Sequence, residues 1–134
     1  MQEREVSVLE KRKIAFICVH NSCRSQIAEA LGKKFLGDKY DFYSAGTETK
    51  DKINQDAVRI MKALYGIDME QSQYPKTIDK IPKVDIMISM GCGVKCPLTY
   101  KSFDADWGLK DPTGCSDEIF VEVIKEIEIF VKKL

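Results

Sequence analysis

The chain has 134 residues, a formal net charge of zero and 44% hydrophobic residues, which suits one globular domain that folds around its own core. Residues 1–13 mix acidic and basic side chains without an apolar run, which argues against a secretory signal peptide. No apolar stretch reaches the roughly eighteen residues of a membrane span, and the lysines are scattered among acids. Nucleic acid and membranes are therefore not expected partners, and we expect a cytoplasmic monomer.

Strand and helix patterns alternate along the chain. In chain order, the periodicity of apolar residues predicts a strand at 13–18, a helix at 24–36, a strand at 41–44, a helix at 55–65, a strand at 84–90, a short strand within 103–109 and a helix at 117–134. Such alternation favours a parallel sheet covered on both faces. We therefore expect a three-layer α/β/α fold with a central four-stranded parallel sheet, formed by a single domain at 13–134 behind a charged N-terminal extension at 1–12.

The first strand leads directly into a candidate oxyanion-binding loop. Cys18 ends the strand, and Arg24 and Ser25 open the helix six and seven positions later. A loop between a strand and a helix N-terminus directs backbone N–H groups at a bound anion, and an arginine adds a two-pronged donor. The same donors stabilise a thiolate, which makes Cys18 a candidate nucleophile. The predicted loop comprises Val19, His20, Asn21, Ser22, Cys23, Arg24 and Ser25.

Five cysteines in a chain that looks cytosolic indicate chemistry or metal binding rather than structural disulfides. Cys92 and Cys96 follow the third predicted strand, so the parallel sheet would bring their loop beside Cys18. Cys92, Cys96 and Cys115 with His20, the single histidine, could alternatively form a zinc site. The spacing lacks a second close cysteine pair, and we expect no metal. We expect His20 to face solvent, Trp107 to pack in the core and Cys115 to play no part.

The loop sequence Asn-Ser-Cys-Arg-Ser-Gln at 21–26 resembles that of the low-molecular-weight tyrosine phosphatase fold, and within it the thioredoxin-coupled arsenate reductases. Phosphatases of this fold usually have Ser-Pro after the arginine, where this chain has Ser25 and Gln26. Further matches are Ser-Ala-Gly-Thr at 44–47, Gly-Ile-Asp at 66–68, and Trp-Gly at 107–108 leading to Asp-Pro at 111–112. The resemblance extends from residue 13 to the C-terminus.

The resemblance implies that Cys18 attacks arsenate, that Cys92 resolves the adduct by forming a disulfide, and that Cys96 passes the oxidation outward. It implies Asp111 as the general acid and Cys23 as a residue that could form a protective disulfide with Cys18. No tightly bound cofactor is expected, since an external thiol reductant, thioredoxin by resemblance, would restore the enzyme. Phosphate is expected to compete with arsenate. The alternatives are a tyrosine phosphatase, which would leave Cys92 and Cys96 idle, and a non-catalytic module that binds an oxyanion or zinc.

Overall fold

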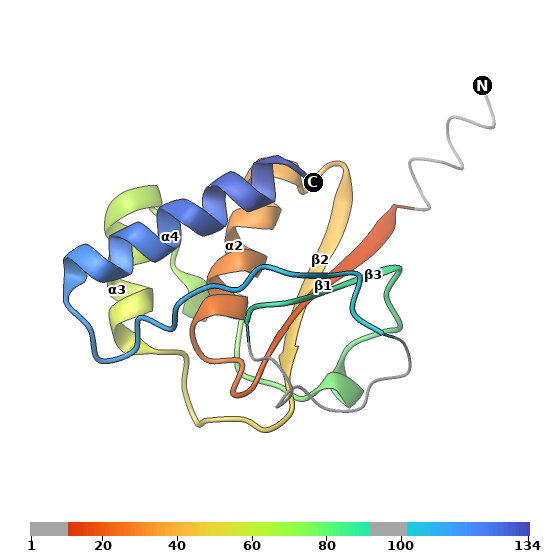
Figure 1. Ribbon diagram of the computed structural model, residues 1–134, viewed down its shortest axis with the longest axis horizontal. Helices are drawn as coiled ribbons and strands as arrows, with labels where there is room; N and C mark the ends of the chain where they lie inside the picture. The colour runs from red at the N-terminus through yellow and green to blue at the C-terminus, as the bar shows by residue number, and fades with distance from the viewer. Residues whose placement is uncertain (1–10, 92–101) are drawn as a thin grey trace.

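The computed structural model describes residues 11–91 and 102–134 (Figure 1). Within these residues the order of elements is β1 (Arg12–Cys18), α2 (Arg24–Leu36), β2 (Tyr40–Gly46), α3 (Gln55–Tyr65), η1 (Met69–Gln71), η2 (Ile78–Lys80), β3 (Ile86–Ser89), β4 (Ala105–Asp106) and α4 (Asp117–Lys132). The predicted alternation of strands and helices is confirmed.

The strands form one sheet in the order β2-β1-β3-β4, with every neighbouring pair parallel. This confirms the predicted four-stranded parallel sheet. The central strand β1 is apolar throughout its second half, because both of its faces are covered: Ile14 through Ile17 are fully buried. Cys18 lies opposite Gly46 in the register of β1 with β2. The ends of these two strands, and the loops that follow them, therefore lie together at one edge of the sheet.

The two faces of the sheet are covered differently. Alternate β1 residues, Ile14 and Phe16, belong to a large core shared with α2, α3 and α4, so these three helices lie on one side (Figure 1). Ala15 and Ile17 point to the other face, into a smaller core. The 3-10 helix η2 and neighbouring coil cover that second face in the described part of the chain, so the third predicted layer is a thin one there.

Local capping groups fix both ends of α3 and the start of α4 where the sequence predicted them. Asn54 caps α3, its side-chain oxygen accepting from the backbone N–H of Ala57 at 3.0 Å. Gly66 adopts a left-handed conformation with φ 70° just after the helix ends. Ser116 caps α4 in the same way as Asn54 caps α3. No helix among the described residues is long and apolar enough to cross a membrane.

The fourth strand is shorter than the predicted stretch 103–109. Only Ala105–Asp106 pairs with β3, because the next residue leaves the strand to pack inward. The ring of Trp107 stacks on Phe130 of α4 at 5.0 Å and lies 5.2 Å from Phe16 of β1. Gly108 then turns the chain with φ 57°. Trp107 is a packing residue, as the sequence predicted.

Candidate active site

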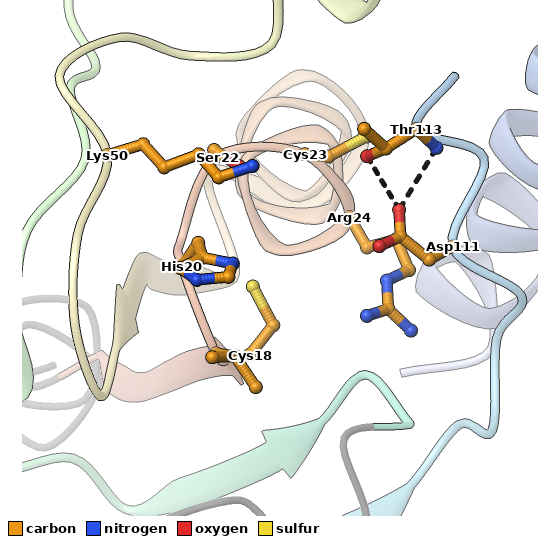
Figure 2. Close-up of a pocket in the computed structure, with 9 residues that line it drawn as sticks. Cys18, His20, Ser22, Cys23, Arg24, Lys50, Asp111 and Thr113 are labelled. Carbon is orange, nitrogen blue, oxygen red and sulfur yellow. Dashed lines mark hydrogen bonds between the residues drawn. The ribbon is translucent and has the colours of Figure 1, made fainter. Parts of the chain in front are cut away.

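A pocket of about 300 Å³ opens at the edge of the sheet where β1 ends. Cys18 lies at its base and is only 4% exposed. The loop before α2 forms one part of the wall, and segments distant in sequence form the rest (Figure 2). The structure thus brings most of the predicted oxyanion loop together with the predicted acid. The lining residues are Cys18, Val19, His20, Ser22, Cys23, Arg24, Lys50, Asp111 and Thr113.

The sulfur of Cys18 is hydrogen-bonded through a short relay of side chains. Its Sγ lies 2.9 Å from Oγ of Ser25, and that Oγ accepts a hydrogen bond from Nδ2 of Asn21 at 2.8 Å. The hydroxyl can accept from the amide and still donate its own hydrogen to the sulfur, and it must be the donor when Cys18 is a thiolate, which has no hydrogen to give. A donor in this position stabilises a thiolate over a thiol. The relay therefore favours Cys18 as the nucleophile.

Asn21 is fixed in an unusual backbone conformation beneath the loop. It is fully buried with φ 52°, the left-handed region that asparagine tolerates better than most residues. Its side-chain oxygen accepts from the backbone N–H of Lys76 and from Nε2 of Gln26, both at 3.0 Å. The Nε2 of Gln73 in turn donates to Oε1 of Gln26 at 2.7 Å. Gln26, which stands where phosphatases usually have proline, thus links the loop to a distant segment.

A buried carboxylate anchors that distant segment. Glu29 of α2 accepts from the hydroxyl of Ser44 at 2.6 Å and from Nζ of Lys33 at 2.5 Å. The Nζ of Lys76 lies 3.9 Å from the same carboxylate. Burial lowers the pKa of Lys76, and the charge of Lys33 adds to that effect, whereas the charge of Glu29 opposes it. Glu29 thus holds the side chain of Lys76 in place. The backbone N–H of Lys76 in turn bonds to Asn21 of the oxyanion loop.

Arg24 spans the site from the first turn of α2. Its Nη1 donates to the carbonyl oxygens of Met90, at 2.9 Å, and Leu109, at 2.7 Å. These two bonds use both hydrogens of Nη1, so a bound oxyanion would be met by Nε and Nη2, which also form a two-pronged donor. The guanidinium therefore combines two tasks, since it joins the end of β3 to the segment that leads to Asp111.

Asp111 lies on the wall beside Arg24 (Figure 2). Its Oδ1 accepts from the hydroxyl of Thr113 at 2.7 Å and from the backbone N–H of Thr113 at 3.1 Å. Burial raises the pKa of Asp111, but the Thr113 hydrogen bonds and the charges of Arg24 and Lys50 outweigh it and leave the pKa lowered. The carboxyl is thus ionised at neutral pH. A bound oxyanion would oppose this by charge repulsion and raise that pKa.

The remaining cysteines differ from Cys18. Burial, followed by the charge of Asp111, raises the pKa of Cys23 to about 12, so that thiol stays protonated and is a poor nucleophile. Cys115 is a partly exposed free cysteine outside the lining. Cys92 and Cys96 lie outside the described residues. Among the described residues, no three histidine, cysteine or acidic side chains are grouped to hold a metal ion. That finding does not test a site that would include Cys92 and Cys96.

Sequence reasoning missed three contributors, namely Lys50, Glu48 and Thr113. Lys50 and Thr113 line the pocket, and Glu48 holds Nε2 of His20 at 2.8 Å. The side chain of His20 was expected to face solvent. It is 40% exposed, but it also lines the pocket and contacts Glu48. A local signal existed for Lys50 and Glu48, because the loop after a second parallel strand opens at the same edge of the sheet as the Cys18 loop.

Known proteins are similar to this chain over most of its length. The family described as low molecular weight phosphotyrosine protein phosphatase matches residues 13–134. The chain belongs to this family. Among its curated members, an arsenate reductase of Halalkalibacterium halodurans is 43% identical over 78% of this chain and 76% of its own length. Arsenate reductase 1 of Bacillus cereus is 38% identical over 92% of this chain and 93% of its own length.

Solved structures of the low molecular weight phosphatase family agree with this relationship. A structure described as an arsenate reductase in the phosphate binding state superposes with a TM-score of 0.80 at 33% identity, covering 91% of this chain and 95% of that one. A thioredoxin-dependent arsenate reductase of Corynebacterium glutamicum gives a TM-score of 0.73 at 29% identity, over 98% of this chain and 68% of its own. The predicted fold is confirmed, and so is the predicted resemblance to arsenate reductases of this family.

Proposed function

We propose that this protein is an arsenate reductase in which Cys18 is the nucleophile. The relay from Asn21 through Ser25 to the sulfur of Cys18 is the observation that carries the proposal, because it supplies a hydrogen bond that favours a thiolate. Arg24 and the loop N–H groups would hold the oxyanion, as the helix N-terminus of a strand-loop-helix unit does for phosphate groups. The curated relatives named as arsenate reductases support the choice of substrate.

In the first step the Cys18 thiolate attacks arsenic, and a hydroxide leaves as water with a proton from Asp111. The product is a thioester of arsenate on Cys18. The charge of the bound oxyanion raises the pKa of Asp111 and so favours its proton-bearing form, while Thr113 orients the carboxyl. Arsenic is still in its pentavalent state at this stage. Two electrons must therefore come from thiols in the steps that follow.

In the second step the Cys92 thiolate attacks the sulfur of Cys18 and forms a Cys18–Cys92 disulfide. The electron pair of the sulfur–arsenic bond moves to arsenic, which leaves as arsenite. Cys96 then attacks Cys92, which frees Cys18 as a thiol and leaves a Cys92–Cys96 disulfide. An external dithiol, for which we propose thioredoxin, reduces that disulfide. The thioredoxin-dependent relative supports this choice of reductant, and no tightly bound cofactor is needed.

The test is a coupled assay with thioredoxin, thioredoxin reductase and NADPH, in which arsenate-dependent loss of NADPH is followed. Wild type is compared with Cys18→Ser, Cys92→Ser and Cys96→Ser, and Cys115→Ser is the matched control. We expect turnover to be lost in the first three variants and retained in the control, with phosphate slowing the wild type. Hydrolysis of an aryl phosphate that needs Cys18 but neither Cys92 nor Cys96, without arsenate turnover, would instead identify a phosphatase.

A further inference from the structure

The pocket is lined by one residue, Lys50, of the loop between β2 and α3, which comprises residues 47–54. Figure 2 shows Lys50 reaching from this loop toward the side of the pocket that Ser22 and His20 occupy. Lys50 lies outside the strand-loop-helix unit that binds oxyanions in folds of this type. It is nevertheless one of the residues that line the pocket.

The loop that bears Lys50 is attached to the oxyanion loop at both ends. At its start, the backbone N–H groups of Thr47 and Glu48 donate to the carbonyl of Val19 at 2.9 and 3.0 Å. At its end, the N–H of Asn54 donates to the carbonyl of Ser22 at 2.7 Å. These bonds fix the two ends of the loop relative to Cys18, so the position of Lys50 beside the pocket follows from the fold.

The glycine at the end of β2 permits this close approach. A Cβ atom at Gly46 would lie 2.6 Å from the carbonyl oxygen of Val19 and 2.9 Å from the backbone nitrogen of Asn21. Both are backbone atoms, which cannot give way as a flexible side chain would. The two loops therefore contact each other through their main chains. The side chain of Lys50 takes no part in that contact and lines the pocket.

The charges of the pocket make a second cation useful. Before the substrate binds, Cys18 in its attacking form and Asp111 are both negative, and the approaching substrate brings further negative charge. Among the described lining residues, Arg24 and Lys50 are the lysine and arginine side chains that oppose them, while His20 is held by Glu48. The Nη1 of Arg24 is already bound to two carbonyl groups. Without Lys50, one guanidinium would thus oppose two negative side chains while an anionic substrate approaches.

We propose that Lys50 is a second substrate-binding cation, which attracts the tetrahedral oxyanion and holds it opposite Arg24. This inference rests on the proposed function, since it names a further residue of the same site. Lys50 is exposed, so its charge acts through solvent and is screened by salt. It therefore contributes to capture of the oxyanion rather than to the chemical step. Its charge also lowers the pKa of Asp111, behind the upward effect of burial and the downward effects of Thr113 and Arg24.

The experiment titrates the full-length reduced protein with inorganic phosphate, which occupies an oxyanion site without changing oxidation state. The dissociation constant is measured at low and at high salt for wild type, Lys50→Met, Lys50→Arg and Lys52→Met. Lys52 is an exposed residue of the same loop outside this pocket, so its variant controls for net charge. We expect Lys50→Met to weaken binding about threefold to tenfold at low salt and less at high salt. Lys50→Arg and Lys52→Met should bind as wild type does.

A second measurement follows the carboxyl of Asp111 by NMR as pH is varied. Loss of the Lys50 charge should raise the pKa of Asp111, and the Lys52→Met variant should leave it unchanged. Equal phosphate affinity in wild type and Lys50→Met, or equal weakening in Lys50→Met and Lys52→Met, would overturn the proposal. Absence of arsenate turnover in a wild type whose phosphate binding depends on Lys50 would overturn the proposed reduction and leave the role of Lys50 supported.

Discussion

The hydroxyl of Ser25, in the first turn of α2, lies 2.9 Å from the sulfur of Cys18 at the end of β1. The strand supplies the proposed nucleophile and the helix supplies its hydrogen-bond partner, so their contact depends on the angle at which the loop joins the two elements. Asn21 sets that angle through its left-handed backbone and its bond to the same hydroxyl. Reactivity at Cys18 is therefore a property of the whole loop.

Replacing Ser25 with alanine should slow the attack of Cys18 by about tenfold to a hundredfold, because a hydrogen bond to a charged group contributes about 1.5–3 kcal/mol. The rate of alkylation of Cys18 by iodoacetamide, followed by mass spectrometry at several pH values, measures this directly. Ser72→Ala, a change at an exposed serine outside the pocket, is the control. Equal alkylation rates in wild type and Ser25→Ala would show that the hydroxyl does not stabilise the thiolate.

The amide pair of Gln26 and Gln73 should contribute to stability as one unit. Replacing either residue by leucine leaves buried polar partners unsatisfied, at a cost of about 1–3 kcal/mol each. Removing both should cost less than the sum of the two, since the pair is hydrogen-bonded at 2.7 Å. Urea unfolding of the single and double variants measures the coupling. Strictly additive losses would mean that the two amides act independently.

The hydrogen bonds of Thr113 should make the stability of the protein depend on pH. Thr113→Val removes the hydroxyl bond and should raise the pKa of Asp111 toward its ordinary value, because that bond lowers it against the effect of burial. A lowered folded-state pKa adds stability above the unfolded pKa of about 3.9 and loses it as the pH falls through the folded value. The stability gap between wild type and Thr113→Val should therefore be present at neutral pH and shrink in acid.

Urea unfolding at neutral and at acid pH measures that gap. Thr49→Val, which alters an exposed threonine outside this pocket, should show no such dependence. A gap between wild type and Thr113→Val that stays constant down to the most acid pH tested would mean that the hydroxyl does not act through the ionisation of Asp111.

Gly46→Ala should abolish phosphate binding while the sheet remains folded. The added Cβ would contact backbone atoms at 2.6–2.9 Å, and relief requires the oxyanion loop to move away from β2. Circular dichroism checks the fold, and a phosphate titration checks the site. Gly66→Ala, which strains a left-handed helix cap at a position with open space around it, is the control and should retain phosphate binding. Wild-type phosphate affinity in Gly46→Ala would contradict the tight fit.

The elements of the fold could be predicted because their signals are local. Helix α2 begins and ends where the apolar period indicates, α3 also where its caps indicate, and β1 is a buried apolar run. Cys18 and Arg24 could be placed in one loop because a strand and a helix flank them. The pairing of Asn21 with Lys76, 55 positions away, has no such signal, since it arises from the docking of two loops.

Two further features of the structure could not be predicted from the sequence, because they also arise from contacts between distant segments. Strand β4 is short because Trp107 packs against α4, a contact that becomes visible only when the helix is in place. Thr113 reaches the pocket from a loop whose sequence resembles an ordinary polar turn. Asp111 could be anticipated only through resemblance to a family, because an Asp-Pro pair by itself indicates no more than a turn. Its position beside Arg24 is a product of the tertiary fold.

The two carbonyl groups bound by Nη1 of Arg24 belong to Met90 and Leu109, which lie on either side of the stretch containing Cys92 and Cys96. The backbone N–H of Leu109 also donates to the carbonyl of Met90 at 3.3 Å, so these two residues are in direct contact. A single guanidinium thus joins Met90 and Leu109 to the pocket that we propose as the oxyanion site. The side chain proposed to bind the oxyanion is therefore the same one that holds Met90 and Leu109 together.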